Sequence, residues 1–166
     1  AQGVFRGGRH KVTLPLKSRP DRQSLTAELA TWETRQFEAD KSGNTIAARD
    51  YGARAERARR WLGRLDGFSN GDIYEMPFSV YRLGDAVWVT CGGEPYNKLQ
   101  TKLRDRFPLW IIIVSPLDSG IEVAYLLPRE QYGKGLYQEE SSLLAAGCLE
   151  KLLDAITARI EKVITN

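Results

Sequence analysis

The sequence predicts an α/β fold with a layered α/β/α arrangement, in which helices pack on a mixed sheet. Strand-like and helix-like segments alternate along the chain, which is typical of this class. Residues 74–83 and 86–91 flank the two-residue turn Gly84-Asp85 and are predicted to form a β-hairpin. A long apolar stripe near the C-terminus, which begins near Ser141, predicts a long final helix.

The N-terminal part is expected to begin with a loop over residues 1–10, followed by a short strand over residues 10–16 that shows apolar alternation. Two helices, or one broken helix, are predicted next, with Ser24 as the first cap and an interruption at residues 41–44. Several arginines lie in the helical segment that follows residues 41–44. We interpret them as a solvated face balanced by acids rather than a phosphate-binding face, because no aromatic residues are interleaved with them.

Residues 86–91 are apolar at nearly every position, which suits an interior strand with both faces covered. Gly92-Gly93 then allows a sharp turn. Pro95 fits the first position of a helix, and apolar residues at helical spacing predict that helix over residues 96–107.

Glu94 is therefore expected at the carboxyl end of a strand and beside a helix N-terminus, where the helix dipole would keep it ionised. Ligands bind at that edge in open α/β sheets. The local pattern by itself favours a plainer role for Glu94, as a residue that complements the helix.

Residues 109–114 are predicted to be a second interior strand, and residues 122–126 a short strand. Residues 128–140 read as an irregular loop of glycines and tyrosines that is long enough to form the wall of a site. In the final helix the apolar residues recur at helical spacing, so the stripe is core packing: Leu149, Leu152, Leu153, Ile156, Ile160, Val163 and Ile164.

The 166 residues suffice for one domain, and 42% hydrophobic with 27% charged residues is ordinary for a soluble globular protein. The net charge of +3 is too small to imply a nucleic-acid partner. Cys91 and Cys148 form no metal-binding motif, and their pairing stays open. No apolar run reaches the roughly 20 residues of a membrane span. The chain starts without Met or a signal peptide, so we expect a processed form or an excised piece.

Several motifs together resemble the neutral/alkaline ceramidase family, and most closely its uncharacterised bacterial relatives. The first is Leu83-Gly84-Asp85, an apolar strand and Gly93-Glu94-Pro95. The second is Glu122–Pro128 followed by Gln131-Tyr132 and Gly135–Gln138, and the segment around Arg54 and Trp61 agrees with them. The resemblance covers nearly the whole chain and maps onto the C-terminal part of the family's catalytic domain.

The resemblance implies a zinc-dependent amide hydrolase in which Glu94 is a metal ligand. The family's tyrosine ligand falls on Glu122 if Tyr125 aligns with the second family aromatic, whereas a slipped register would place Tyr125 in the site. A carboxylate could replace a phenolate, because both are hard oxygen donors. We expect Gly93, Tyr125, Tyr132 and Tyr137 to shape the pocket.

The family's two zinc histidines have no match, and His10 stands in no recognisable motif. The N-terminal part of the same protein is therefore the expected partner that completes the site, and zinc is expected in the intact protein only. The isolated chain is expected to be inactive, without metal and prone to self-association. An amide or lipid-like substrate follows from the resemblance alone.

Two other functions stay open. The chain could be a non-catalytic relative that serves as an interaction or scaffold domain, which the missing histidines and the tyrosine-to-glutamate change favour. A basic nucleic-acid-binding module on the arginine-rich helix is the weaker alternative. The sequence leaves the cellular location open, with export of the intact protein as one option.

Overall fold

The computed structural model describes residues 3, 5–18, 21–67, 73–118, 120 and 122–165. The chain divides into two compact units, one formed by residues 1–17 with 72–166 and the other by residues 18–71. We describe each unit by itself. That residues 1–166 are the C-terminal portion of a larger hydrolase domain stays a prediction.

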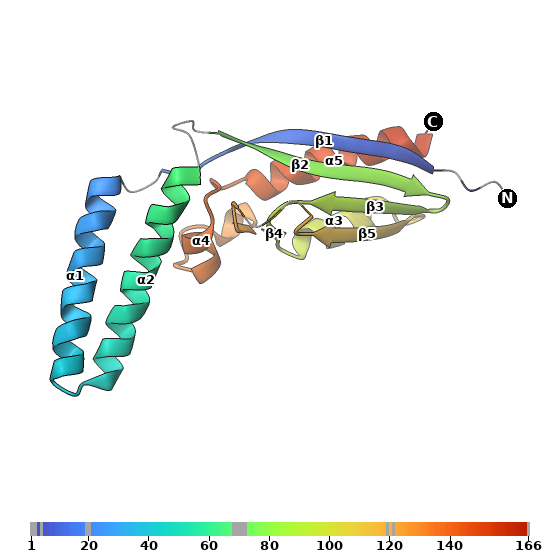
Figure 1. The fold of residues 1–166 in the computed structure, drawn as a ribbon. Helices are drawn as coiled ribbons and strands as arrows, with labels where there is room; N and C mark the ends of the chain where they lie inside the picture. The colour runs from blue at the N-terminus through green and yellow to red at the C-terminus, as the bar shows by residue number, and fades with distance from the viewer. Residues whose placement is uncertain are drawn as a thin grey trace. The chain divides into compact units, whose positions relative to one another are not determined.

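The larger unit contains a four-stranded mixed sheet in the order β1-β2-β3-β5 (Figure 1). The strands are β1 (Phe5–Pro15), β2 (Ile73–Leu83), β3 (Ala86–Cys91) and β5 (Ile111–Pro116). The pairs β1/β2 and β2/β3 are antiparallel, whereas β3 and β5 are parallel. The predicted mixed sheet with its hairpin is confirmed.

Two strand predictions were wrong in detail. The N-terminal segment is a strand from Phe5 onward, because β1 pairs with β2 along its whole length, from Phe5 opposite Leu83 to Pro15 opposite Ile73. This long-range ladder overrides the weak local strand propensity of the Gly7-Gly8 stretch. The second predicted interior strand is β5, and it lies at the edge of the sheet.

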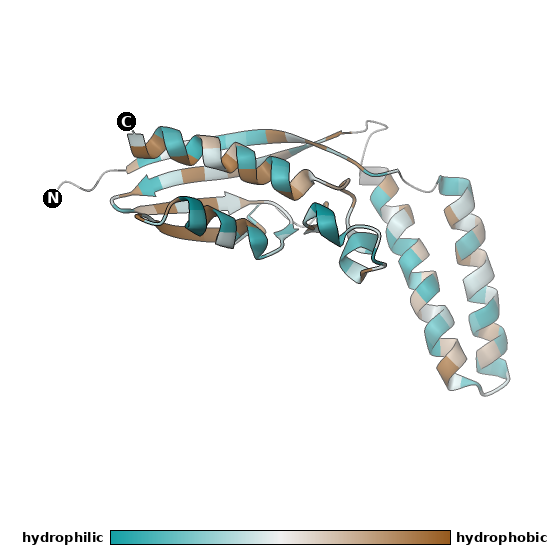
Figure 2. Cartoon of the chain, turned by 180° about the vertical axis from the view of Figure 1, so that it is seen from behind, coloured by the Kyte–Doolittle hydropathy of each residue, from teal (hydrophilic) through white to brown (hydrophobic). Residues whose placement is uncertain are grey.

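The helices α3 (Lys98–Arg106) and α5 (Cys148–Thr165) both lie on one face of this sheet, as Figures 1 and 2 show from opposite sides. On α5, the buried positions include Leu149, Leu152, Ile156 and Ile160, so the predicted core stripe is confirmed. The helix begins at Cys148 and not near Ser141. A separate short helix, α4 (Tyr137–Ser141), ends there, and Ser142 has an extended backbone.

The remaining elements of this unit are short. A second sheet has two parallel strands, β4 (Glu94–Pro95) and β6 (Tyr125–Leu126). A 3₁₀ turn, η1 (Arg129–Gln131), and α4 lie within the segment predicted to be an irregular loop. The prediction of an irregular loop was therefore only partly right, since these two short helical elements lie within it.

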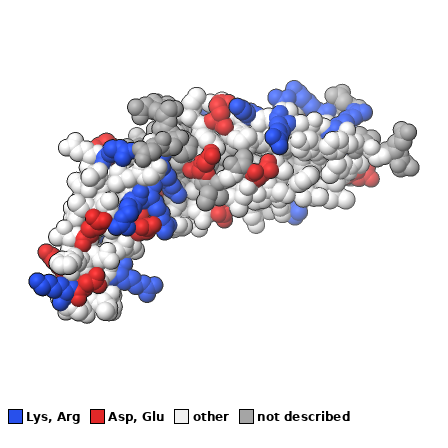
Figure 3. Space-filling view, viewed as in Figure 1, with Lys and Arg blue, Asp and Glu red and all other residues white. Residues whose placement is uncertain are grey.

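The opposite face of the four-stranded sheet carries exposed apolar side chains, which we call the open face: Phe5, Leu83, Trp88, Ile111 and Ile113. Residues opposite one another in a ladder share a face, and Trp88 stands opposite both Tyr81 and Ile113. Trp88 is 40% and Ile113 44% exposed. Figure 3 looks onto this face and shows few charged side chains over β3 and β5. The expectation that both faces of β3 are covered was therefore wrong.

The smaller unit is a pair of helices, α1 (Arg22–Lys41) and α2 (Thr45–Gly67), which is the first of the two alternatives that the sequence left open. The cap of α1 is Asp21, whose carboxylate accepts the Ser24 N–H at 2.8 Å, so the assignment of Ser24 as the cap was wrong. The Trp32 ring stacks on Tyr51 at 5.8 Å. Two arginine guanidinium groups lie over the Trp32 ring.

Some of the arginines on α2 are neutralised locally. Arg59 pairs with Glu33 at 2.7 Å and with Glu56 at 3.1 Å, and Arg60 pairs with Glu56 at 3.0 Å. These contacts are those of a solvated helix face, in keeping with our interpretation of the sequence. They leave less uncompensated charge for a polyanion to neutralise.

Candidate functional site

Glu94 does not lie beside a helix N-terminus, as we had expected. Glu94 and Pro95 form β4, and α3 begins only at Lys98 after its cap residue Asn97. The Glu94 N–H donates to Ala124 O at 2.8 Å, and the Tyr96 N–H donates to Leu126 O at 3.0 Å. These bonds to β6 hold the segment extended where the sequence pattern suggested a helix.

The backbone on both sides of this small sheet is unusual. Gly93 has φ +66°, and a Cβ there would lie 2.9 Å from Ala124 O and 2.8 Å from Leu126 Cδ1. Ala124 has φ +56°, in a region that residues with a side chain rarely adopt. Such unusual backbone conformations concentrate at functional sites, so Gly93 and Ala124 make this turn a candidate functional site.

This arrangement places Glu94 directly opposite Tyr125 in the β4/β6 register. The negative charge of the Glu94 carboxylate is the main cause that raises the pKa of Tyr125 above its ordinary value, with burial second. The Tyr137 ring meets the Tyr125 ring edge-on, with centroids 6.1 Å apart. Two oxygen-bearing side chains from distant parts of the chain thus share one edge, with an aromatic neighbour.

Buried polar contacts fix the segment that carries Tyr125. The Ser142 hydroxyl, which is fully buried, donates to Tyr125 O at 2.6 Å and accepts the Leu144 N–H at 3.1 Å. The Tyr132 hydroxyl donates to Leu144 O at 3.0 Å, and burial raises the pKa of Tyr132 to about 12. Tyr132 therefore anchors the loop behind the site, while Tyr137 contacts Tyr125.

Glu122, the other predicted ligand, has a different partner. The Tyr74 hydroxyl on β2 donates to Glu122 Oε2 at 2.8 Å. Burial and this carboxylate together raise the pKa of Tyr74 to about 12. The structure thus gives Glu122 a contact with β2, and gives Glu94 a neighbour in Tyr125.

His10 lies on β1 and packs against Phe78, with ring centroids 5.4 Å apart. It lines a pocket together with residues of α5 rather than the Glu94 edge. Cys91 and Cys148 are both buried and both free, so they form no disulfide. Burial raises the pKa of the Cys91 thiol to about 12 and that of the Cys148 thiol to about 11.

The described residues contain no group of three or more His, Cys, Asp or Glu side chains that could hold a metal ion. The Glu94 edge therefore offers at most a partial ligand set. Sequence reasoning missed Ser142 and Ala124, whose roles depend on contacts with distant backbone. Only the Ser-Ser pair at 141–142, a polar signal just before an apolar run, could have pointed to Ser142.

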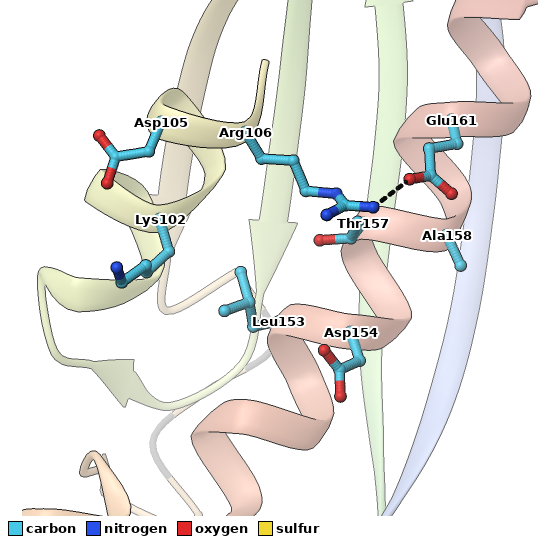
Figure 4. A pocket seen from close by; sticks show the side chains of 8 residues that line it. All are labelled: Lys102, Asp105, Arg106, Leu153, Asp154, Thr157, Ala158 and Glu161. Carbon is cyan, nitrogen blue, oxygen red and sulfur yellow. Dashed lines mark hydrogen bonds and ion pairs between the residues drawn. The ribbon is translucent and has the colours of Figure 1, made fainter. Parts of the chain in front are cut away.

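A separate groove of about 510 Å³ lies between α3 and α5 (Figure 4). Arg106 of α3 reaches toward α5 and pairs with Glu161 at 2.8 Å, as the dashed line shows. The other charged lining residues are of both signs, namely Lys102, Asp105 and Asp154. Mixed and solvated charges of this kind do not select a ligand of one sign, and no predicted site residue lies there.

Comparisons with known protein families, with characterised proteins and with solved structures give no match to this chain. Within the part of the chain that the structure describes, no helix has both the length and the apolar character needed to cross a membrane.

Proposed function

We propose that this chain is the C-terminal part of a ceramidase-like zinc-dependent amide hydrolase and contributes Glu94 and Tyr125 to its metal site. The observation that carries the proposal is the pairing of these two residues on β4 and β6. The motif resemblance names the Glu of Gly93-Glu94-Pro95 and a tyrosine of the downstream aromatic segment as ligands. The register supports Tyr125 as that tyrosine, in preference to Glu122.

The chemistry of the two side chains fits part of a zinc site. A carboxylate and a phenolic oxygen are hard oxygen donors, and a catalytic zinc commonly has three protein ligands with one open position. The remaining ligands would come from the N-terminal part of the protein. When bound, zinc polarises a carbonyl or lowers the pKa of a water molecule.

Other residues of this chain would position Glu94 and Tyr125 for metal binding. Gly93 allows the strand to pass close to Ala124, so that Glu94 can stand opposite Tyr125. Ser142 holds the Tyr125 backbone in place, because its hydroxyl donates to Tyr125 O and accepts the Leu144 N–H. Tyr137 contacts the Tyr125 ring edge-on.

The open face supports the idea of a missing partner. All-parallel sheets are almost always covered on both faces, and the pair β3/β5 is the parallel part of this mixed sheet. Trp88, Ile111 and Ile113 nevertheless remain exposed. An apolar layer from the N-terminal part of the same protein would bury them.

The test is the zinc content of the full-length protein, measured by elemental analysis after purification from its native source. Glu94→Gln and Tyr125→Phe should each lower the zinc content strongly, since each removes a ligand. Glu122→Gln should leave the zinc content unchanged, and Glu38→Gln on α1 is the control for loss of a carboxylate. Unchanged zinc in Glu94→Gln would contradict the proposal, and loss in Glu122→Gln alone would return the ligand role to Glu122.

A second candidate is a non-catalytic interaction or scaffold domain. The open face favours it as well, because an exposed apolar surface is typical of a binding site for another protein. A full-length protein with the fold intact and without stoichiometric zinc would support this candidate over the hydrolase.

A further inference from the structure

Cationic side chains surround a pocket between β1 and the last turns of α5. The pocket has a volume of about 300 Å³ and is lined by Arg6, Gly7, His10, Arg159, Lys162 and Val163. None of these lining residues is acidic. The volume lies at the lower end of the range for small-molecule sites, roughly 300–1,000 Å³.

We propose that this pocket binds a phosphate monoester group, carried by a small soluble molecule or by a lipid head group. Arg159 and Lys162 are three residues apart on α5 and therefore lie on the same side of the helix. Arg6 faces them from β1. Arginine and lysine donors that converge in this way match the several acceptor oxygens and the double charge of a phosphate monoester.

The charge of these residues is not used elsewhere in the described structure. Arg6, Arg159 and Lys162 form no ion pair with any described carboxylate, and the nearby Glu161 pairs with Arg106. Positive charge that gathers around a pocket without an acidic partner raises the local concentration of anions. The pocket is therefore expected to attract anions.

Cations near a helix C-terminus can also serve only to complement the helix dipole. Here Arg82 of β2 already does so, because its Nη1 lies 3.3 Å from Ile164 O and 3.5 Å from Val163 O. The Arg82 guanidinium also lies over the Trp110 ring, at 4.7 Å from the centroid. The last carbonyls of α5 thus have a donor that is not part of the pocket lining, which leaves Arg159 and Lys162 to a ligand.

His10 adds a hydrogen-bonding group to the pocket, and its imidazole can report on anion binding there. Burial, followed by the charges of Arg159 and Lys162, lowers the pKa of His10 from its ordinary value. The two charged groups that act on it, Arg159 and Lys162, are both positive, as is Arg6, which lines the same pocket. A bound dianion would offset them and raise the pKa of His10. Since the chain has one histidine, its imidazole signal is unique in a proton NMR spectrum.

The experiment follows that signal in the purified chain during a titration with sodium phosphate, at an ionic strength held constant with sodium chloride. We expect a saturable shift and a higher pKa of His10 in saturating phosphate, whereas sodium acetate should give no saturable shift. Glycerol 3-phosphate and phosphatidylcholine vesicles with or without phosphatidic acid form two further arms. Binding to the first identifies a soluble ligand, and binding only to the phosphatidic acid vesicles identifies a lipid head group.

Lys162→Gln and Arg159→Gln should each weaken phosphate binding about tenfold, because each removes a charge-assisted hydrogen bond. Lys151→Gln, on the same helix and outside the pocket, is the matched control and should bind as the wild type does. Thermal melts monitored by circular dichroism would check that each variant is folded. A His10 shift that follows only ionic strength, or equal weakening by Lys151→Gln, would overturn the proposal. The result does not depend on the metal proposal, whose readout is zinc content.

Discussion

Glu94 and Tyr125 stand directly opposite each other on the parallel strands β4 and β6. The Glu94 carboxylate is the main cause of the raised pKa of Tyr125, so the two side chains interact electrostatically as well as by register. Glu122, three residues before Tyr125, is bound instead by the Tyr74 hydroxyl. The choice between the two predicted ligand positions thus depends on a backbone register that the sequence left open.

Gly93→Ala should lower the free energy of unfolding by about 2–3 kcal/mol, through backbone strain and a clash with Ala124 O. Gly133→Ala is the matched control. Gly133 also has a positive φ, of 78°, but a Cβ there meets nothing within 4 Å. It should cost only about 1 kcal/mol. Urea unfolding of the two variants measures the difference, and equal losses would show that the close approach at Gly93 is unimportant.

Ser142→Ala should destabilise the protein by about 1–3 kcal/mol, because Tyr125 O and the Leu144 N–H would both lose a buried partner. Ser115→Ala is a suitable comparison. Ser115 accepts the exposed Trp88 indole N–H at 3.0 Å, and water can replace it there. We expect a loss within about 0.5 kcal/mol for that variant. A comparable loss in both variants by chemical denaturation would argue against a special role for Ser142.

The open face predicts that the isolated chain self-associates. Trp88→Gln combined with Ile113→Gln should shift the chain toward monomer, since both side chains are exposed and stand opposite each other on the open face. Sedimentation velocity at several concentrations measures this shift. Ile46→Gln removes a 78% exposed isoleucine from α2 and should not change the association. Monomeric wild-type chain at high concentration would contradict the prediction.

Stability should fall at alkaline pH through Cys91. Burial raises its pKa from 9.0 to about 12 in the folded chain. The protonated thiol therefore contributes fully below pH 9, and that contribution declines by up to about 1.4 kcal/mol per pH unit as the pH rises toward 12.

Urea unfolding between pH 8 and pH 11 tests this, with Cys91→Ala expected to have a shallower decline than the wild type. Cys148→Ala should reduce the slope less, because the pKa of Cys148 rises only to about 11. Identical slopes in all three proteins would show that the buried thiols do not govern the alkaline loss of stability.

Local patterns predicted the elements that carry their own periodicity. The stripe on α5 and the turn at Gly84-Asp85 can each be recognised within a short stretch of sequence, because helical periodicity and the choice of hairpin turn depend on neighbouring residues. The residues at which helices begin were less well predicted. Glu94 and Pro95 satisfy the rules for a helix start, yet hydrogen bonds to residues 124 and 126 hold them in a strand.

The sequence by itself determined the α/β class, the hairpin and the apolar stripe of the final helix, since propensity and periodicity act over a few residues. Only the tertiary structure decided that β5 is an edge strand, that one face of the sheet is open, and that Tyr125 rather than Glu122 faces Glu94. It also brought His10 to Arg159 and Lys162. These relations join residues far apart in the chain, and pairing register and packing, which no local pattern encodes, fix them.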